Sequence, residues 1–311
     1  MRGHAVKRAR NLSPTLSRIL AAFLLLLAGA LHAAQPEPHA RVILDQLISL
    51  KAAIAAAGAP DNARYLTVWD FDGTILDGDC SEGLQRNGEQ VYPGLAQVTI
   101  EAGLSGLYPA EGGFRQFWSD YDWMEEHVGE WMAYPFIVQM LRGAAVERLD
   151  EVTRQAFKQY YAAHIFATSA WLIRQLESAG IETVVLSASP ELFVRGAAES
   201  LGLDRSRFNG IRVAIEDGRV TEKLLYPVTW ADGKRERLQQ LSAKRPGEQP
   251  VVVIGGFGNS YSTDGPFLEW IAKQDLSGGR ALAVMINGGE APPRYQGLFR
   301  EVRQQAVAAP Y

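Results

Sequence analysis

The sequence predicts an α/β fold with a mostly parallel central sheet, because three apolar, strand-like runs are separated by segments with helical patterns. The runs are YLTVW at residues 65–69, IETVVL at 181–186 and PVVVIG at 250–255. Each run ends in polar or glycine-rich residues, which is typical of a strand that meets a loop. Because open α/β sheets bind ligands at the carboxyl ends of their strands, the residues just after these runs are candidates for a functional site.

The first run is followed by DFDGT, which sets Asp70 and Asp72 two residues apart and lets Gly73 turn the chain sharply. One ionised aspartate can attack phosphorus while the other, in its protonated form, donates to the leaving oxygen. A cation is needed to reduce the repulsion between the two carboxylates. The pair therefore predicts phosphoryl transfer, and the alternative is a strand that ends in an Asp-rich turn.

The DFDGT segment resembles the DxDxT motif of the haloacid dehalogenase (HAD) superfamily, whose phosphatases use an Mg²⁺-assisted phospho-aspartate intermediate. The resemblance implies a Rossmann-like HAD core in which Asp70 is the nucleophile and Asp72 is the general acid, then the general base. It also implies that Thr74, and Ser187 in SASPE after the second run, bind the phosphoryl group. The alternative for the serines is a helix N-cap, a role that Ser189 fits at least as well.

The third motif of the family is a lysine at the start of a helix, and Lys234 in GKRERL resembles it by order and spacing. Lys223 is the competing lysine, but it lies in TEKLL, which is predicted to end a hairpin built on the Asp217-Gly218 turn. The resemblance implies that Lys234 binds phosphoryl oxygens and offsets charge in the transition state.

The fourth motif departs from the family pattern in GGFGNSYSTDG at residues 255–265. Asn259 stands where the family has an acidic residue, and Asp264 is the second acid. The resemblance implies that Mg²⁺ is held by Asp70, the backbone carbonyl of Asp72, and Asn259 with Asp264 nearby. An amide oxygen can coordinate Mg²⁺ but brings no charge, so we expect weaker metal binding.

The amino terminus predicts export. Five basic residues precede the apolar run ILAAFLLLLAGA at 19–30, which is short for a membrane span and typical of a signal peptide. We predict a signal peptide over residues 1–34, a periplasmic or secreted location, and no stable membrane association after cleavage; the alternative is an uncleaved anchor. Without this segment the chain has 26 basic against 35 acidic residues, a net charge of −9 that disfavours nucleic acid as a partner.

The remaining length suits a catalytic core with an inserted domain. We predict an N-terminal helix over residues 35–61, the core over 62–80 and 168–311, and a cap over 81–167. The cap segment has helical periodicity and no convincing strand. In this it resembles the helical cap of phosphoserine-phosphatase-like members of the superfamily.

The cap segment 114–136 is both aromatic and acidic, a combination that can hold an alkylammonium group by cation–π and Coulomb attraction. Trp123 and Trp131 are the rings that this hypothesis tests, and the alternative is that the aromatic residues form the core of the cap. Asp79 and Glu82, just beyond the nucleophile loop, are further candidates for substrate contact.

These features predict an Mg²⁺-dependent phosphatase that hydrolyses a small phosphorylated metabolite through an aspartyl-phosphate intermediate. Within the superfamily the chain resembles exported phosphoserine- or phosphorylcholine-phosphatase-like members, so phosphocholine, phosphoethanolamine and phosphoserine are candidate substrates. The alternative is a non-catalytic exported ligand-binding protein on a HAD fold, with Asn259 marking a degraded metal site. The sequence predicts no particular oligomeric state.

Overall fold

The structure is a computed structural model that describes residues 36–244, 247–305 and 307. The described residues belong to one compact unit. The predicted signal peptide, with its cleavage site, lies outside the described residues. Among the residues that are described, no helix is both long enough and apolar enough to cross a membrane.

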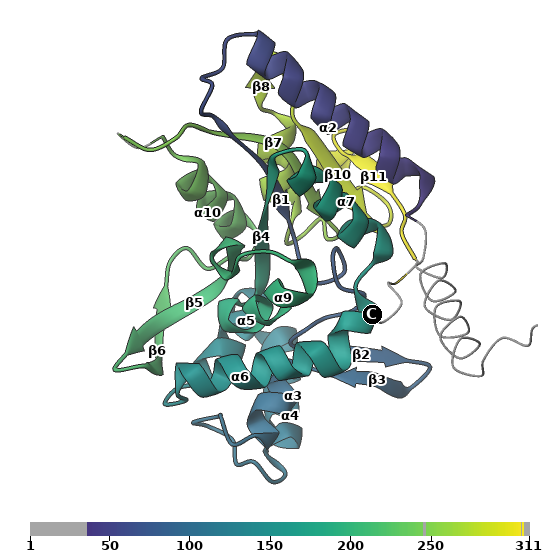
Figure 1. The fold of residues 1–311 in the computed structure, drawn as a ribbon. Coiled ribbons are helices and arrows are strands. Elements are labelled where there is room, and N and C mark those ends of the chain that lie inside the picture. The colour runs from purple at the N-terminus through teal and green to yellow at the C-terminus, as the bar shows by residue number, and fades with distance from the viewer. Residues whose placement is uncertain (1–35, 245–246, 306, 308–311) are drawn as a thin grey trace, which may run out of the picture. The chain divides into compact units, whose positions relative to one another are not determined.

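A seven-stranded sheet forms the centre of the core (Figure 1). In spatial order its strands are β11 (Arg300–Val302), β10 (Leu282–Ile286), β7 (Val251–Gly258), β1 (Arg64–Trp69), β4 (Ile181–Pro190), β5 (Phe208–Glu216) and β6 (Arg219–Leu225). All neighbouring strands are parallel except β5 and β6. The predicted α/β fold with a mostly parallel sheet is therefore confirmed, and the three predicted strands are the neighbours β7, β1 and β4.

Helices cover both faces of the sheet around β1. They are α2 (Pro38–Ala56), α7 (Ala167–Ser178), α10 (Asp232–Ser242) and α11 (Gly265–Ala272). Trp69 belongs to the same apolar cluster as residues of α2 and α7, whereas its neighbour Val68 packs with residues of α10 and α11. Successive side chains of a strand point to opposite faces, so β1 is buried from both sides and its carboxyl end is held firmly in place.

The segment between β1 and β4 is mainly helical. It contains β2 (Gly83–Arg86), β3 (Glu89–Pro93), α3 (Leu95–Glu101), α4 (Gly113–His127), α5 (Glu130–Gln139), α6 (Val146–Ala156), η1 (Phe157–Tyr161) and η2 (Ala162–His164). The prediction that this segment has no strand is wrong. Asn87 and Gly88 both have positive φ, 54° and 80°, and form the turn of the β2–β3 hairpin. Both strands are short and partly exposed, which weakens their apolar pattern. We call residues 81–167 the cap; that they form a domain of their own stays a prediction.

Short elements complete the core. They are α8 (Glu191–Val194), η3 (Arg195–Ala197), α9 (Ala198–Leu201), η4 (Arg205–Arg207), β8 (Asp275–Leu276), β9 (Gly279–Arg280) and η5 (Pro293–Tyr295). Strands β8 and β9 pair with each other and not with the central sheet.

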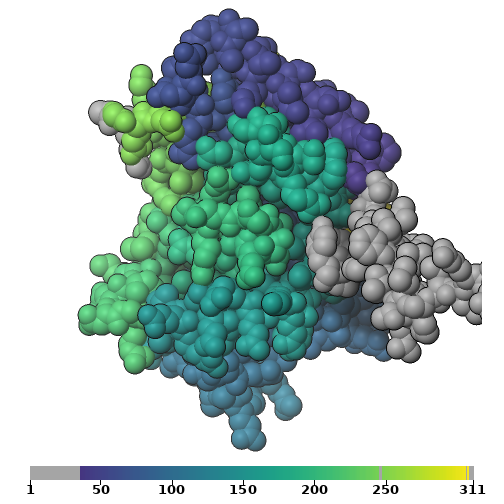
Figure 2. Space-filling view, viewed as in Figure 1, coloured from purple at the N-terminus to yellow at the C-terminus, as the bar shows by residue number. Residues whose placement is uncertain are grey.

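The hairpin of β5 and β6 joins the sheet to the cap. Its turn has positive φ at Asp217 and Gly218, 49° and 73°, so the predicted hairpin is confirmed. The backbone N–H of Gly143 in the cap donates to Val220 O at 2.7 Å, and Val220 N–H donates to Ala144 O at 3.0 Å. Figure 2 shows the green residues of this hairpin against the teal residues of the cap. Backbone hydrogen bonds thus fix one side of the cap to the edge of the sheet.

Candidate active site

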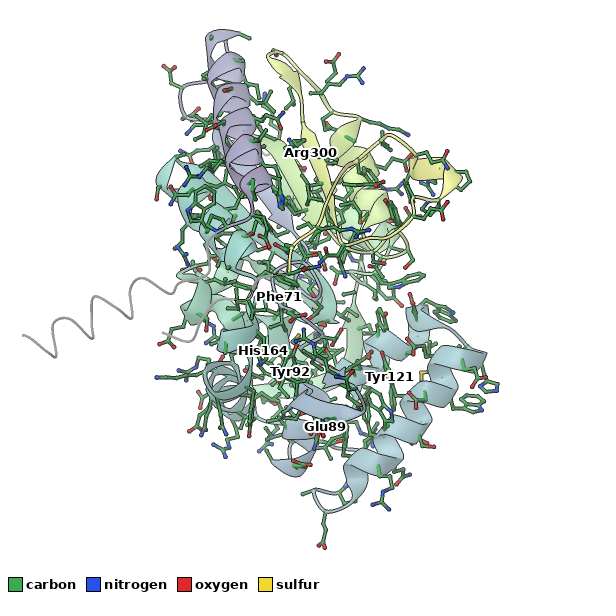
Figure 3. The ribbon with its side chains drawn as sticks, turned by 90° about the vertical axis from the view of Figure 1, so that its right-hand side faces the viewer. Phe71, Glu89, Tyr92, Tyr121, His164 and Arg300 are labelled. Atoms are coloured by element: carbon green, nitrogen blue, oxygen red, sulfur yellow. The ribbon has the colours of Figure 1, made fainter. Side chains whose placement is uncertain are left out.

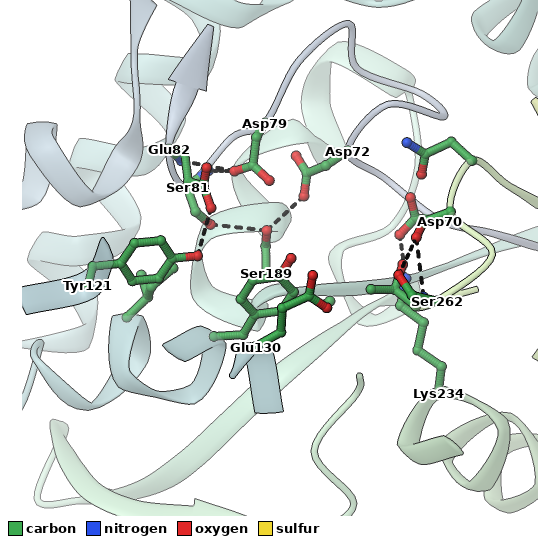
Figure 4. Close-up of a pocket in the computed structure, with 16 residues that line it drawn as sticks. Asp70, Asp72, Asp79, Ser81, Glu82, Tyr121, Glu130, Ser189, Lys234 and Ser262 are labelled. Carbon is green, nitrogen blue, oxygen red and sulfur yellow. Dashed lines mark hydrogen bonds and ion pairs between the residues drawn. The ribbon is translucent and has the colours of Figure 1, made fainter. Parts of the chain in front are cut away.

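Asp70 comes directly after β1, and its backbone N–H donates to Phe257 O of β7 at 2.8 Å. The chain then turns back, because Gly73 has a φ of 71° and its N–H donates to Leu76 O at 2.8 Å. The turn brings Asp70 and Asp72 to the wall of one cavity (Figure 4). The carboxyl edge of the sheet therefore carries both predicted carboxylates.

Residues of β3, η1 and η2 support this turn and the loop that follows it. Phe71, between the two aspartates, is fully buried, and its ring centroid lies 5.8 Å from that of Phe157. Tyr92 of β3 donates its hydroxyl to Asp77 O at 2.7 Å and stands with its ring 4.9 Å from that of His164 (Figure 3). Packing and hydrogen bonds on this side leave the loop little freedom to move.

The cavity has a volume of about 160 Å³ and lies between the core and the cap. Its core wall includes Asp70, Asp72, Ser189, Lys234 and Asn259, and its other wall includes Asp79, Ser81, Glu82, Tyr121, Glu130 and Tyr134. A space of this size accepts a phosphoryl group with a small organic substituent.

Lys234, in the first turn of α10, is the cation of the site. Its side chain is 1% exposed, and its Nζ lies 2.5 Å from Asp70 Oδ1 and 2.6 Å from Asp264 Oδ1. Burial lowers the pKa of Lys234, but the charges of Asp264 and Asp70 outweigh burial and the pKa is raised overall. Lys234 is therefore charged. The competing Lys223 is exposed in β6 and does not line this cavity.

The two aspartates differ in their electrostatic settings. Burial, then the charge of Asp264, raises the pKa of Asp70 to about 7, although Lys234 acts in the opposite direction. Burial, then the charges of Asp79 and Asp70, raises the pKa of Asp72 well above its usual range. One carboxylate that is paired with a lysine and one that favours its protonated form suit the roles of nucleophile and general acid.

Asp72 is held at both oxygens. The backbone N–H of Cys80 donates to Oδ1 at 2.7 Å, and the hydroxyls of Ser189 and Ser187 donate to Oδ2 at 2.7 and 3.3 Å. Strand β4 continues to Pro190, the residue that precedes α8, so the alternative N-cap role of Ser189 is wrong. Ser189 lines the cavity, whereas the lining residues do not include Ser187.

Thr74 is fully buried and lies behind the nucleophile. Its hydroxyl donates to Asp70 Oδ2 at 3.1 Å and lies 3.4 Å from Asn259 Oδ1. This hydroxyl orients the carboxylate and the amide that the sequence predicts as metal ligands. It does not line the cavity.

Asp264 does not line the cavity, and protein groups contact both of its carboxylate oxygens. Its Oδ1 is engaged by Lys234, and its Oδ2 accepts hydrogen bonds from the backbone N–H groups of Asn259 and Ser260 at 2.9 and 3.0 Å. The Asp264 side chain therefore holds the lysine and the loop that carries Asn259.

The oxygens of Asp70 and Asn259 do fit a hard cation such as Mg²⁺. Both side chains line the cavity, and Thr74 contacts an oxygen of each. In the described part of the chain, no cluster of three or more His, Cys, Asp or Glu side chains is arranged to hold a metal ion. The expected site differs from such a cluster because it uses an amide and a backbone carbonyl.

A second group of carboxylates forms the opposite wall. Asp79 Oδ1 accepts from the backbone N–H groups of Ser81 and Glu82 at 2.6 and 2.9 Å. Glu82 Oε1 accepts from the Tyr121 hydroxyl at 2.6 Å. Burial, then the charge of Asp79, raises the pKa of Glu82 to about 8. Both predicted substrate contacts, Asp79 and Glu82, thus lie at the cavity.

The cap supplies residues that the sequence did not single out. Glu130, the first residue of α5, lines the cavity and accepts at Oε2 from the indole N–H of Trp230 in the core at 3.0 Å. Tyr121 and Tyr134 are the aromatic residues on this wall. Trp230 is 100 positions from Glu130, so no local pattern connects them.

The two predicted tryptophans lie elsewhere. Trp123 and Trp131 are 57% and 53% exposed and do not line the cavity, so the hypothesis that they hold a substrate cation is wrong in its choice of rings. The alternative role of the aromatics holds for Phe117, which is buried and stacks on Tyr121 and Phe136 at centroid distances of 5.7 and 6.1 Å.

An α/β core with two aspartates after its central strand and a buried lysine beside them defines a class of hydrolases. The family described as haloacid dehalogenase-like hydrolase matches residues 67–269, well over half of the chain. The chain therefore belongs to the haloacid dehalogenase-like hydrolase family.

Known proteins of similar sequence carry phosphatase names. The chain is 25% identical over 201 residues to a histidinol-phosphatase of Neisseria meningitidis. The matched residues are 64% of this chain and 81% of the relative. It is 25% identical over 214 residues to a probable phosphatase of Mycobacterium tuberculosis, with 68% of each chain covered. A solved structure of a functionally unknown protein from Anaerococcus prevotii shares the fold, with a TM-score of 0.58, 13% identity, and coverage of 87% of this chain and 94% of that one.

Proposed function

We propose that the protein is a phosphomonoesterase that hydrolyses a small phosphorylated metabolite through an aspartyl-phosphate. The observation that carries the proposal is the buried Lys234, which pairs with Asp70 at a cavity that Asp72 also lines. A cation beside the first aspartate and a raised pKa at the second aspartate are what this chemistry requires. The similarity to two proteins with phosphatase names supports the same reaction.

In the first step an oxygen of Asp70 attacks phosphorus, and the bond from phosphorus to the ester oxygen breaks. Asp72 gives its proton to that oxygen, so an alcohol leaves and Asp72 becomes a carboxylate. In the second step Asp72 takes a proton from a water molecule that attacks phosphorus, and inorganic phosphate and Asp70 are released. Lys234 offsets the negative charge on the phosphoryl oxygens in both steps.

We infer that Mg²⁺ is the cofactor, held by the carboxylate of Asp70, the backbone carbonyl of Asp72 and the amide oxygen of Asn259. When bound, it reduces the repulsion between the nucleophile and the phosphate and stabilises charge in the transition state. Asp264 supports this site through Lys234 and the backbone of Asn259.

We infer further that the substrate carries an amine, as phosphoethanolamine, phosphocholine and phosphoserine do. Three carboxyl groups, those of Asp79, Glu82 and Glu130, line the cavity across from Lys234 (Figure 4). A bound ammonium group favours their ionised forms. In this arrangement the phosphate meets the lysine while the ammonium group meets the carboxylates and the rings of Tyr121 and Tyr134. The small volume, about 160 Å³, favours a small substrate over a folded phosphoprotein.

We also propose that the enzyme is exported, since residues 1–34 have the composition of a signal peptide. The test is fractionation of cells that express the full-length chain. Recovery of a shortened protein in the periplasm or medium supports export, and recovery of the unshortened chain in the membrane supports the uncleaved anchor.

The function is tested by incubating the protein, without residues 1–34, with Mg²⁺ and a panel of phosphomonoesters. We expect release of inorganic phosphate, and we expect Asp70→Asn to abolish it while the melting temperature shows a folded protein. Wild-type rates in Asp70→Asn would end the aspartyl-phosphate mechanism. Tight binding of phosphoesters without any turnover would favour the ligand-binding alternative, in which Asn259 marks a site that has lost catalysis.

A further inference from the structure

We propose that Ser189, together with Ser81 behind it, is a positioning residue that holds Asp72 in both protonation states of the reaction cycle. The inference rests on the proposed phosphatase function and concerns two side chains to which the expected motifs assign no catalytic role. It depends on a chain of hydroxyl groups that ends on the carboxyl group of Asp72.

The chain of hydroxyls is short and almost completely buried. Ser81 and Ser189 are 2% and 6% exposed. The hydroxyl of Ser81 donates to Ser189 Oγ at 3.0 Å, and the hydroxyl of Ser189 donates to Asp72 Oδ2 at 2.7 Å. Figure 4 shows Ser189 between the other two residues. Ser81 lies 108 positions from Ser189 in sequence, so the fold and not a motif brings them together.

The local backbone explains why Ser189 reaches Asp72. The register between β4 and β5 shifts between Leu186 and Pro190, so the end of β4 departs from regular pairing. Within this irregular end, the backbone N–H of Ser189 donates to Ser187 Oγ at 3.0 Å. Both hydroxyls therefore lie near Asp72 Oδ2, at 2.7 Å for Ser189 and 3.3 Å for Ser187.

The reaction requires Asp72 to be an acid in the first step and a base in the second. The backbone N–H of Cys80 on Oδ1 can only donate, so it favours an unprotonated oxygen there. A serine hydroxyl can donate or accept. Ser189 donates to the carboxylate form, and it can accept from the acid form while it donates to Ser81 in turn. The proton of Asp72 is thereby kept on Oδ2, and the carboxyl group stays in one orientation through both steps.

The leaving group supplies a test specific to this role. An alkyl phosphate has a poor leaving group and needs the proton of Asp72, whereas a nitrophenyl phosphate has a good one and does not. In Ser189→Ala, we expect kcat/KM for ethyl phosphate to fall about tenfold, because one hydrogen bond to a charged group is lost. We expect kcat/KM for nitrophenyl phosphate to change by less than about twofold. The kcat for nitrophenyl phosphate should still fall, because hydrolysis of the aspartyl-phosphate needs Asp72 as a base.

Three further variants complete the experiment. Ser189→Thr keeps the hydroxyl and should retain most of the kcat/KM for ethyl phosphate. Ser81→Ala removes the far end of the chain and should give a smaller loss with the same dependence on the leaving group. Ser178→Ala removes an exposed hydroxyl that donates to Arg174 O of its own helix, and its kcat/KM for both phosphates should equal that of the wild type. Melting temperatures check that each protein is folded.

Equal losses of kcat/KM for both phosphates, or a rise in KM alone, would overturn the inference, because a residue that binds phosphate affects both substrates alike. An unchanged kcat/KM for ethyl phosphate in Ser189→Ala would overturn it as well. A wild-type protein that hydrolyses neither phosphate would instead overturn the proposed function, and the inference with it.

Discussion

The side-chain amide of Asn259 lies directly over the backbone of Gly73. A Cβ atom added at Gly73 would come within 2.0 Å of Asn259 Nδ2 and 2.7 Å of its Cγ. The loop after β7 therefore packs on the nucleophile loop with no space between them, and Gly73 is needed both for its φ of 71° and for this contact. The amide that replaces an expected acid is thus held in place at the site.

The first prediction is that Asn259→Asp tightens Mg²⁺ binding. The two side chains have nearly the same shape, but the aspartate adds a charge beside Asp70. We expect the Mg²⁺ concentration for half-maximal activity to fall about tenfold or more. Without metal the melting temperature should fall through repulsion, and with Mg²⁺ it should rise more than in the wild type.

The control for this charge is Asn87→Asp, in the turn of the β2–β3 hairpin. It adds the same charge away from the cavity and should leave the Mg²⁺ dependence unchanged. A weaker or unaltered dependence in Asn259→Asp would show that residue 259 is not a ligand.

A second prediction concerns Lys234→Met, which keeps the length of the side chain and removes its charge. Asp70 and Asp264 are then left without their buried partner, so the free energy of unfolding should fall by about 3–5 kcal/mol. Turnover should fall by about a hundredfold to a thousandfold, because the phosphoryl oxygens lose a cation. Urea titration and steady-state rates measure the two effects.

Lys223→Met is the matched control, since Lys223 is exposed in β6 and outside the cavity. Its rates and stability should stay close to those of the wild type. If Lys223→Met loses activity and Lys234→Met does not, the assignment of the third motif is wrong.

The sequence was sufficient for the parts of this site that follow a strand end or begin a helix. Asp70, Asp72, Lys234 and Asn259 occur in an order that fixes their places around the sheet edge, and all four line one cavity. The hairpin β2–β3 was missed, because partly exposed strands lack the apolar pattern by which β1 was predicted.

Contacts between distant segments could not be predicted in the same way. The hydrogen bond from the Trp230 indole to the Glu130 carboxylate joins the core to the cap, and no sequence spacing predicts it. The partners of Asp264, which are Lys234 and backbone N–H groups of its own loop, were not predicted either. Such partners depend on the three-dimensional arrangement, which a single sequence does not state.

A third prediction concerns stability and pH. Burial, then the charge of Asp79, raises the pKa of Glu82 from 4.5 to about 8. Between these pH values the folded state binds more protons at Glu82 than the unfolded state does, so this group costs stability as the pH rises. As the pH rises from about 4.5 to about 8, the free energy of unfolding of the wild type should therefore fall relative to that of Glu82→Gln. Above about pH 8 the difference should not change further.

Glu82→Gln is a suitable comparison because its amide oxygen can still accept from the Tyr121 hydroxyl. Melting temperatures of both proteins, recorded across the pH range without Mg²⁺, give the difference. A difference that is constant with pH, or one that favours the wild type at high pH, would contradict a raised pKa at Glu82.

The last prediction addresses the substrate. If the carboxylates opposite Lys234 hold an ammonium group, phosphoethanolamine should be hydrolysed with a higher kcat/KM than ethyl phosphate, which has no amine. The expected ratio is roughly thirtyfold, which corresponds to about 2 kcal/mol for a cation in a largely desolvated pocket. Glu130→Gln keeps the acceptor for the Trp230 indole and removes one charge from the wall, so it should reduce the ratio while sparing ethyl phosphate.

Trp123→Leu and Trp131→Leu test whether the carboxylates of the cavity hold the ammonium group, or whether the two tryptophans do, as the sequence predicted. Both rings are more than half exposed and lie outside the cavity, so neither substitution should alter the ratio. If either one lowers it as Glu130→Gln is expected to, the rings must approach the substrate when it binds, and the cap must then move. Equal kcat/KM for both phosphates in the wild type would mean that the acidic wall does not select for an amine at all.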